Sequence, residues 1–154
     1  MRVMAIDYGS RATGIAISDE LQITVRPLTT IKTDRRGLGS LIEKVVQLAR
    51  EYDVKTILVG LPLRLDGTRG DAALHVERFA GRLGEQIAVP VILRDERLTS
   101  RAADELLRDQ GADSERRRRH SDQVAAAIIL EDYLAESERN RLAAETQGHP
   151  KLEV

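Results

Sequence analysis

The chain has 154 residues and no cysteine, which excludes disulfides, thiolate metal sites and a thiol nucleophile. Its 24 Lys and Arg residues against 25 Asp and Glu residues give a net charge of −1, so no overall basic field points to a polyanionic partner. The length predicts one domain, and the absence of a long apolar run or a signal peptide predicts a cytoplasmic protein that does not enter a membrane.

Three strands are predicted at the start of the chain. Arg2–Asp7 is an unbroken apolar run that ends at Asp7, which is typical of a central strand buried on both faces. Thr13–Ser18 and the β-branched segment Ile23–Thr33 predict two more strands. Because the connections between these segments are short, we expect the three strands to form an antiparallel meander.

Helices and strands alternate in the rest of the chain. The sequence first predicts a helix opened by a capping box at Ser40–Glu43, a strand Thr56–Gly60, a loop Leu61–Gly70 and a helix with the apolar stripe Val76 to Ile87. It then predicts a strand Val89–Asp95, a helix Thr99–Gln110, a polar loop Gly111–Arg119 and a helix from Ser121 to about Glu136. We therefore expect an α/β fold with a mixed five-stranded sheet, three antiparallel strands followed by parallel ones, and helices on both faces. Residues 1–136 form the predicted domain, and residues 137–154 a flexible tail.

Three carboxylates occupy positions where chemistry is expected. Asp7 and Glu96 each follow a predicted buried strand, where open α/β sheets place ligand sites. Asp122 begins the last helix on the face that Ala125, Ala126 and Ile129 continue, so it points into the fold unless it only complements the helix dipole. Three converging carboxylates without His or Cys favour one or two Mg²⁺ or Mn²⁺ ions, which suit phosphoryl chemistry.

Basic residues lie next to these acids in the sequence. Arg11 and Arg97 are close to Asp7 and Glu96, and the run Arg116, Arg117, Arg118 and Arg119 comes just before Asp122. Such a run is commonly a solvated loop, yet beside an acidic metal site it is well placed to hold a phosphate backbone. Tyr8 is the one aromatic residue near the predicted site, so we expect backbone contacts to dominate over base stacking.

Four ordered motifs resemble a known family. They are Asp7-Tyr8-Gly9-Ser10-Arg11 with Gly14, Val59-Gly60-Leu61-Pro62 with Asp66-Gly67, Asp95-Glu96-Arg97-Leu98-Thr99-Ser100, and Asp122 with Ala125-Ala126. In order and spacing, residues 2–135 resemble the YqgF (RuvX) family. The resemblance implies an RNase H-like fold and a metal site formed by Asp7, Glu96 and Asp122. The substrate-binding residues that we predict are Tyr8, Gly9, Arg11, Arg97, Thr99, Arg116, Arg117, Arg118 and Arg119.

The resemblance implies a metal-dependent nuclease that processes the 5′ end of pre-16S rRNA during ribosome biogenesis. One alternative is a nuclease similar to Holliday-junction resolvases, which would act on DNA as a dimer because two symmetric cuts need two sites. A second alternative is a non-catalytic RNA-binding ribosome assembly factor. An actin-like ATPase needs two lobes, and this length supplies one. The partner is therefore predicted to be nucleic acid, and a monomer and a homodimer both stay open.

Overall fold

The computed structural model describes residues 1–96 and 114–148, the latter without side chains up to Asp122. Five strands form one sheet in the order β3-β2-β1-β4-β5. They are β1 (Arg2–Asp7), β2 (Ala12–Ser18), β3 (Val25–Lys32), β4 (Val54–Leu61) and β5 (Val91–Asp95). The pairs β1/β2 and β2/β3 are antiparallel, whereas β1/β4 and β4/β5 are parallel. The predicted mixed sheet is confirmed, with strand ends within two residues of the predicted ones.

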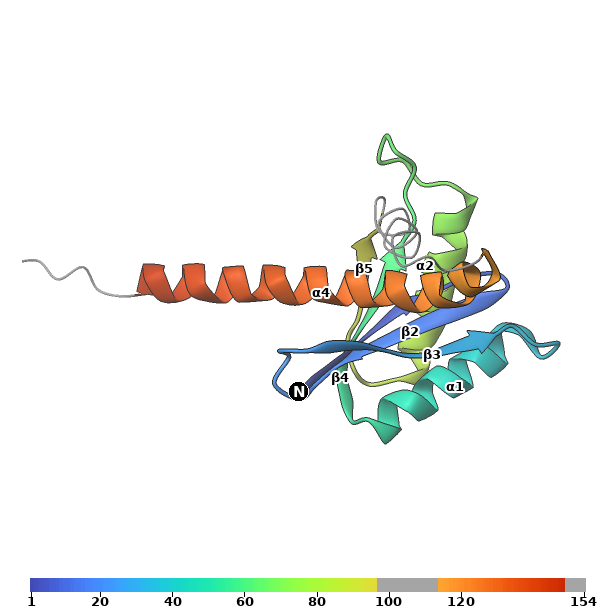
Figure 1. The fold of residues 1–154 in the computed structure, drawn as a ribbon, viewed down its shortest axis with the longest axis horizontal. Coiled ribbons are helices and arrows are strands. Elements are labelled where there is room, and N and C mark those ends of the chain that lie inside the picture. Colours follow the sequence, from blue (N-terminus) through green and yellow to red (C-terminus); the bar gives the residue numbers. More distant parts are fainter. Residues whose placement is uncertain (97–113, 149–154) are drawn as a thin grey trace, which may run out of the picture.

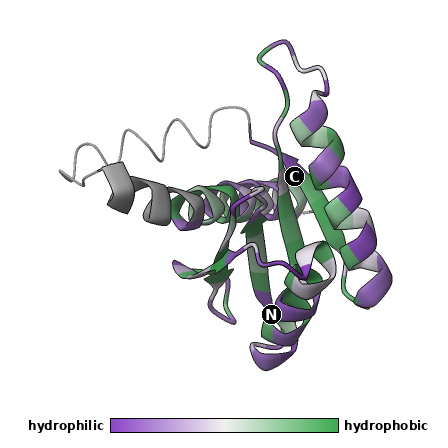
Figure 2. Cartoon of the chain, turned by 90° about the vertical axis from the view of Figure 1, so that its right-hand side faces the viewer, coloured by the Kyte–Doolittle hydropathy of each residue, from purple (hydrophilic) through white to green (hydrophobic). Residues whose placement is uncertain are grey.

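Three described helices cover the two faces of this sheet. Helices α1 (Gly37–Glu51) and α2 (Asp71–Gln86) pack on one face, and α4 (Ser114–Gly148) crosses the other (Figure 1). Side chains of β1 alternate between the faces, so that Met4 and Ile6 face α1 and α2 while Val3 and Ala5 face α4. Helices on both faces are therefore confirmed, and the strands between them are predominantly hydrophobic (Figure 2).

The predicted start of the first helix is wrong. A capping box at Ser40–Glu43 would leave Ser40 outside the helix, but α1 begins at Gly37 and Ser40 is buried within it. The N-cap residue is Arg36, and Asp34 holds the approach to the helix, because its Oδ1 accepts the N–H of Arg36 at 2.9 Å and its Oδ2 accepts the Ser40 hydroxyl at 3.1 Å. The helix therefore gains one turn before the predicted cap.

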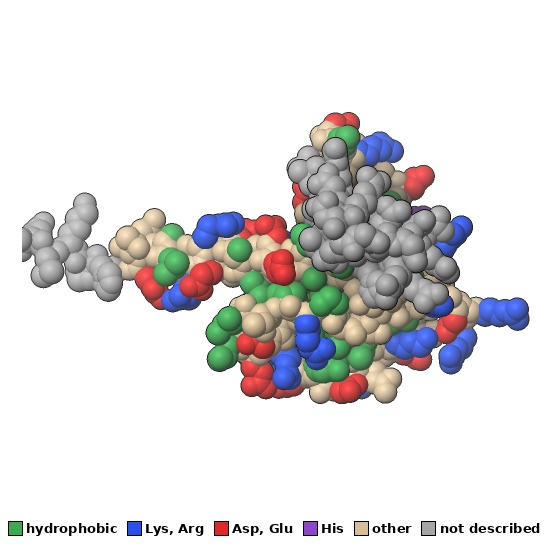
Figure 3. Space-filling view, viewed as in Figure 1, with side chains coloured by type: hydrophobic (Ala, Val, Ile, Leu, Met, Phe, Trp, Pro, Cys, Tyr) green, Lys and Arg blue, Asp and Glu red, His purple; other side chains and the backbone are tan. Residues whose placement is uncertain are grey.

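Helix α4 is longer at both ends than predicted. It already includes Arg116, Arg117, Arg118 and Arg119, so this run is helical and not part of a polar loop. It also continues through residues 137–148, which were predicted as an irregular tail. Arg141 bonds to Glu138 at 2.6 Å and to Glu145 at 2.5 Å, and such pairs stabilise a solvated helix that has no apolar stripe. Acidic and basic side chains mark this projecting part of α4 (Figure 3).

Two other sequence predictions concern residues 97–154. The predicted helix Thr99–Gln110 lies outside the described residues, as do residues 149–154 of the predicted tail.

Among the helices that the structure describes, none combines the length and the apolar character needed to cross a membrane.

Candidate functional site

The carboxyl ends of three parallel strands place Asp7 and Glu96 side by side. Ile6 of β1 pairs with Val59 of β4, so Asp7 is level with the next residue, Gly60. Gly60 in turn pairs with Arg94 of β5, two residues before Glu96. The two carboxyl groups are hydrogen-bonded to each other. The structure thus brings together two of the three acids that the sequence singled out.

Glycines flank Asp7 in both neighbouring strands. Strand alternation puts Asp7 on the face that carries Val3 and Ala5, which is the face covered by α4. The antiparallel partner of Asp7 is Gly14, and its parallel neighbour is Gly60. These two residues have no side chain, so the sheet leaves space around Asp7 on the α4 side.

Gly60 is a residue that the sequence analysis did not select as part of the site. A Cβ at this position would overlap Oε2 of Glu96 and stand 2.7 Å from Cδ1 of Ile129 in α4. The Glu96 side chain therefore lies across the bare backbone of Gly60 to reach Asp7. A single glycine inside an otherwise apolar strand is the signal that could have revealed this close approach.

Burial governs the charge of Glu96. The residue is 7% exposed, and this burial raises the pKa of its carboxyl group to about 7. The charge of Asp95 raises the pKa further, whereas the hydrogen bond with Asp7 lowers it. Glu96 is therefore protonated more readily than a solvated carboxylate, and its buried Oε2 has no hydrogen-bond partner among the described residues.

These features fit a hard divalent cation. A cation bound between the carboxyl groups of Asp7 and Glu96 would favour their charged forms and satisfy the orphaned oxygen of Glu96, and oxygen donors of this kind suit Mg²⁺ or Mn²⁺. Within residues 1–96 and 114–148, no group of three acidic, histidine or cysteine side chains comes together around such an ion. The side chain of Asp122, the third predicted ligand, lies outside the described residues.

Two polar contacts hold α4 across the sheet near Asp7. At the β3 edge, Nε2 of Gln123 donates to the Thr30 hydroxyl at 2.7 Å. Thr30 pairs with Gly14, which pairs with Asp7, so this contact lies in the same cross-strand row as the acid. At the β5 edge, Arg94 donates to Glu136 at 2.7 Å and to Asp132 at 3.3 Å.

Residue 122 lies within helix α4. It directly precedes Gln123 and stands two helical turns before Ile129, which contacts the Gly60 and Glu96 region. The hydrogen bond from Gln123 to Thr30 therefore holds the helix backbone next to residue 122 over the cross-strand row that contains Asp7.

Three of the predicted substrate-binding residues, Tyr8, Gly9 and Arg11, lie between β1 and β2. The half-buried Tyr8 ring stacks on buried Phe79 of α2, with centroids 4.8 Å apart, so one face of the ring packs on the side of the sheet opposite α4. A Cβ on Gly9 would overlap the Ala12 carbonyl, so Gly9 is needed for the β1–β2 turn itself. Arg11 is exposed in this turn.

The remaining predicted contacts are less defined. Arg116, Arg117, Arg118 and Arg119 occupy the first turns of α4, and Arg97 and Thr99 lie outside the described residues.

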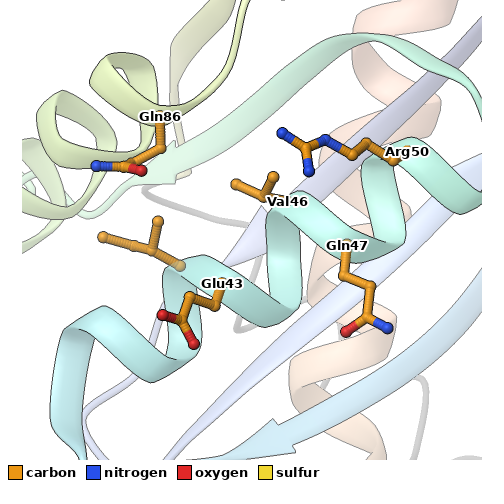
Figure 4. A pocket seen from close by; sticks show the side chains of 6 residues that line it. Glu43, Val46, Gln47, Arg50 and Gln86 are labelled. Carbon is orange, nitrogen blue, oxygen red and sulfur yellow. The ribbon is translucent and has the colours of Figure 1, made fainter.

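A groove of about 370 Å³ lies elsewhere, between α1 and α2 (Figure 4). Its lining residues are Ile42, Glu43, Val46, Gln47, Arg50 and Gln86. Since α1 and α2 cover the face opposite α4, this groove is separated from Asp7 and Glu96 by the sheet. The groove is therefore not part of the candidate site at the carboxyl ends of the strands.

Comparisons with known proteins agree with this geometry. A family model described as "RuvX: Holliday junction resolvase" matches residues 1–136. A Syntrophus aciditrophicus protein named "Putative pre-16S rRNA nuclease" is 43% identical over 136 residues, which are 87% of this chain and 88% of that protein. A protein of the same name from Geobacillus kaustophilus is 40% identical over 134 residues, covering 87% of this chain and 97% of that one.

Solved structures show the same fold at low identity. Thermus thermophilus RuvC in complex with a Holliday junction substrate matches with a TM-score of 0.52 and 19% identity, covering 89% of this chain and 96% of that one. Fowlpox virus resolvase in complex with Holliday junction DNA matches with a TM-score of 0.55 and 12% identity, covering 88% and 98%. These likenesses confirm the predicted RNase H-like fold, in its RuvC-like form. Given the family match and the relatives above 40% identity, the chain belongs to the RuvX family.

Proposed function

We propose that residues 1–136 form a metal-dependent nuclease that hydrolyses phosphodiester bonds in nucleic acid, with the 5′ end of pre-16S rRNA as its substrate in the cytoplasm. The observation that carries the proposal is the contact between the carboxyl groups of Asp7 and Glu96 at the strand ends, where Glu96 is buried and its Oε2 has no hydrogen-bond partner among the described residues. The names of the relatives at 43% and 40% identity support pre-16S rRNA as the substrate.

In this proposal the three acids hold one or two Mg²⁺ or Mn²⁺ ions. When bound, such ions supply an activated water and neutralise charge on the leaving 3′ oxygen. Asp7 contributes a carboxylate fixed by the end of β1, and Glu96 contributes one fixed across Gly60. Asp122 is carried by α4, which Gln123 and Thr30 hold at the level of Asp7.

The basic residues bind and orient the phosphate backbone. Arg11 is exposed next to Asp7 in the chain, and the run Arg116–Arg119 lies on the turn of α4 that leads to Asp122. These guanidinium groups would hold phosphates beside the acids, because planar donors match phosphate oxygens. Tyr8 supports the site from beneath through its stack on Phe79.

The description of the matching family model favours a second candidate, the cleavage of four-way DNA junctions. This activity needs two symmetric incisions and therefore a dimer that presents two sites. Analytical ultracentrifugation at micromolar concentration separates the candidates, since a strict monomer argues against junction resolution.

The decisive experiment compares cleavage of end-labelled single-stranded RNA, single-stranded DNA and a four-way junction in Mn²⁺ and in EDTA. We expect Asp7→Asn to abolish Mn²⁺-dependent cleavage without loss of folding. The matched control is Asp53→Asn, since Asp53 is an exposed acid that pairs with Lys55 and precedes the amino end of β4, at the opposite end of this strand from the candidate site. Full activity of Asp7→Asn in preparations free of contaminating nuclease would remove the proposal.

A further inference from the structure

A loop projects from the edge of the sheet that carries the candidate acids. Residues 62–70, between β4 and α2, leave the carboxyl end of β4 and extend away from α1 (Figure 1). We call this segment the β4–α2 finger. Its base is joined to the site, because the carbonyl of Leu61 accepts the N–H of Glu96 at 3.1 Å and that of Leu63 at 3.1 Å. The base of the finger is therefore joined to the backbone of Glu96.

The finger is held by its own hydrogen bonds. The N–H of Arg64 donates to the Thr68 carbonyl at 2.9 Å, and the N–H of Gly67 donates to the Arg64 carbonyl at 2.8 Å. Oδ1 of Asp66 accepts the N–H and the hydroxyl of Thr68 at 2.9 and 2.6 Å. Gly67 adopts a φ of +84°, which closes the turn. These bonds pre-organise the loop for a partner.

Contacts with α2 fix the base of the finger. Leu63 and Arg69 form an antiparallel bridge, and Nε of Arg69 lies 3.1 Å from Oε1 of Glu77 in α2. The guanidinium of Arg64 lies beside Gly70, where a Cβ would approach its Nε to 3.1 Å. Both ends of the finger are therefore anchored, and its tip is presented in a defined position.

The tip presents an apolar side chain between two cations. Leu65 is 85% exposed, while Arg64 and Arg69 are exposed on either side of it. The Asp66 carboxylate accepts two hydrogen bonds from Thr68 within the turn and Arg69 is paired with Glu77 at the base, which leaves Arg64 as the cation next to Leu65 in the chain. A scattered exposed leucine needs no explanation. An exposed leucine on a pre-organised basic loop beside a nuclease site is the arrangement of a wedge against nucleic acid, where apolar side chains insert at base steps and cations hold the backbone.

We propose that the finger recognises the place where a paired region of the substrate ends. Leu65 packs against the terminal base pair, Arg64 and Arg69 contact the adjoining phosphates, and the unpaired strand passes on to the acids. This inference rests on the proposed nuclease function and names its substrate class, a strand cut next to the end of a duplex. A protein partner fits less well, because one leucine supplies too little apolar surface for a stable protein interface.

The test compares two RNA substrates of the same cleavage sequence, one unstructured and one carrying a hairpin stem directly beside the cleavage site. We expect Leu65→Ser to cleave the hairpin substrate about tenfold more slowly, as the loss of one apolar contact to a base step suggests, and to cleave the unstructured strand at the wild-type rate. The control is Leu21→Ser, since Leu21 is 76% exposed in the β2–β3 turn at the opposite edge of the sheet. We expect this variant to match the wild type on both substrates.

A binding measurement separates the finger from the chemistry. A 2-aminopurine placed in the terminal base pair of the stem reports unstacking, and the Asp7→Asn background prevents cleavage. We expect a fluorescence increase on binding that disappears when Leu65→Ser is added. If the wild type cleaves no nucleic acid, the nuclease proposal fails and this measurement still decides the role of the finger. Equal signals with and without Leu65, or equal loss of cleavage on both substrates, would overturn the inference.

Discussion

The close approach of Glu96 to Gly60 leads to a prediction about Gly60→Ala. The new methyl group would overlap Oε2 of Glu96 and stand 2.7 Å from Cδ1 of Ile129 in α4, and both of these side chains are buried. Overpacking of this kind costs about 1–3 kcal/mol. We expect the free energy of unfolding of the variant to be about 2 kcal/mol below the wild-type value, because the two neighbouring side chains cannot make room without disturbing their own packing.

Relief of one of the two clashes gives a sharper test. Ile129→Val deletes the Cδ1 atom and by itself costs about 1 kcal/mol. Combined with Gly60→Ala, it makes room for the new methyl group, so we expect the double variant to be more stable than the sum of the single effects by about 1 kcal/mol. Cleavage should stay low in the double variant, since Glu96 remains displaced from Asp7.

The assays are urea denaturation in EDTA and cleavage rates in Mn²⁺. Gly84→Ala in α2 is the matched control, because a Cβ there meets nothing within 4 Å. This helical substitution should raise stability by about 0.5–1 kcal/mol and leave cleavage unchanged. Wild-type stability and activity of Gly60→Ala, or strict additivity with Ile129→Val, would refute the reasoning.

Three further predictions concern charge and helix placement. The pKa of Glu96 lies at about 7 in the folded protein against 4.5 in the unfolded chain, so the folded state binds the extra proton between these values. Stability of the metal-free protein should therefore fall as pH rises through this window, by at most about 3 kcal/mol, and urea titrations of Glu96→Gln from pH 4 to 8 should show a flatter profile. Thr30→Val removes the hydroxyl that accepts the hydrogen bond from Gln123, so it should lower the cleavage rate and weaken Mn²⁺ binding measured by calorimetry. Thr30→Ser keeps a hydroxyl and should restore both. Identical Mn²⁺ affinity in the wild type and the two variants would contradict a role of this contact in positioning α4. Replacement of Arg116–Arg119 by Ala should weaken RNA binding and flatten its salt dependence, and an unchanged salt slope would place the phosphate contact elsewhere.

The sheet and two of its acids could be predicted because their signals are local. Val3–Ile6 is apolar without interruption and leads to Asp7, whereas β5, which leads to Glu96, was predicted as buried but is a partly exposed edge strand that contains Arg94. Parallel strands then bring their carboxyl ends together whatever the details of packing. The prediction needed only the order of the strands, which the short first connections and the later helices supply.

The missed features depend on contacts between distant residues. Ser40 carries a capping pattern, but its hydroxyl donates to Asp34 and the helix already begins at Gly37. The aromatic ring of Tyr8 could be placed only once Phe79 was known to lie beneath it. The role of Gly60 likewise requires knowledge that Glu96 folds back across β4.

Helix α4 also has a consequence for synthesis of the protein. Val3, Ala5, Ala16 and Leu58 form the apolar face that only α4 covers among the described elements, and this helix is the last described element of the chain. A nascent chain thus exposes this face until residues 114–136 have emerged. Because the same helix carries Asp122, the third proposed metal ligand, the covering of the apolar face and the completion of the proposed site are a single docking step.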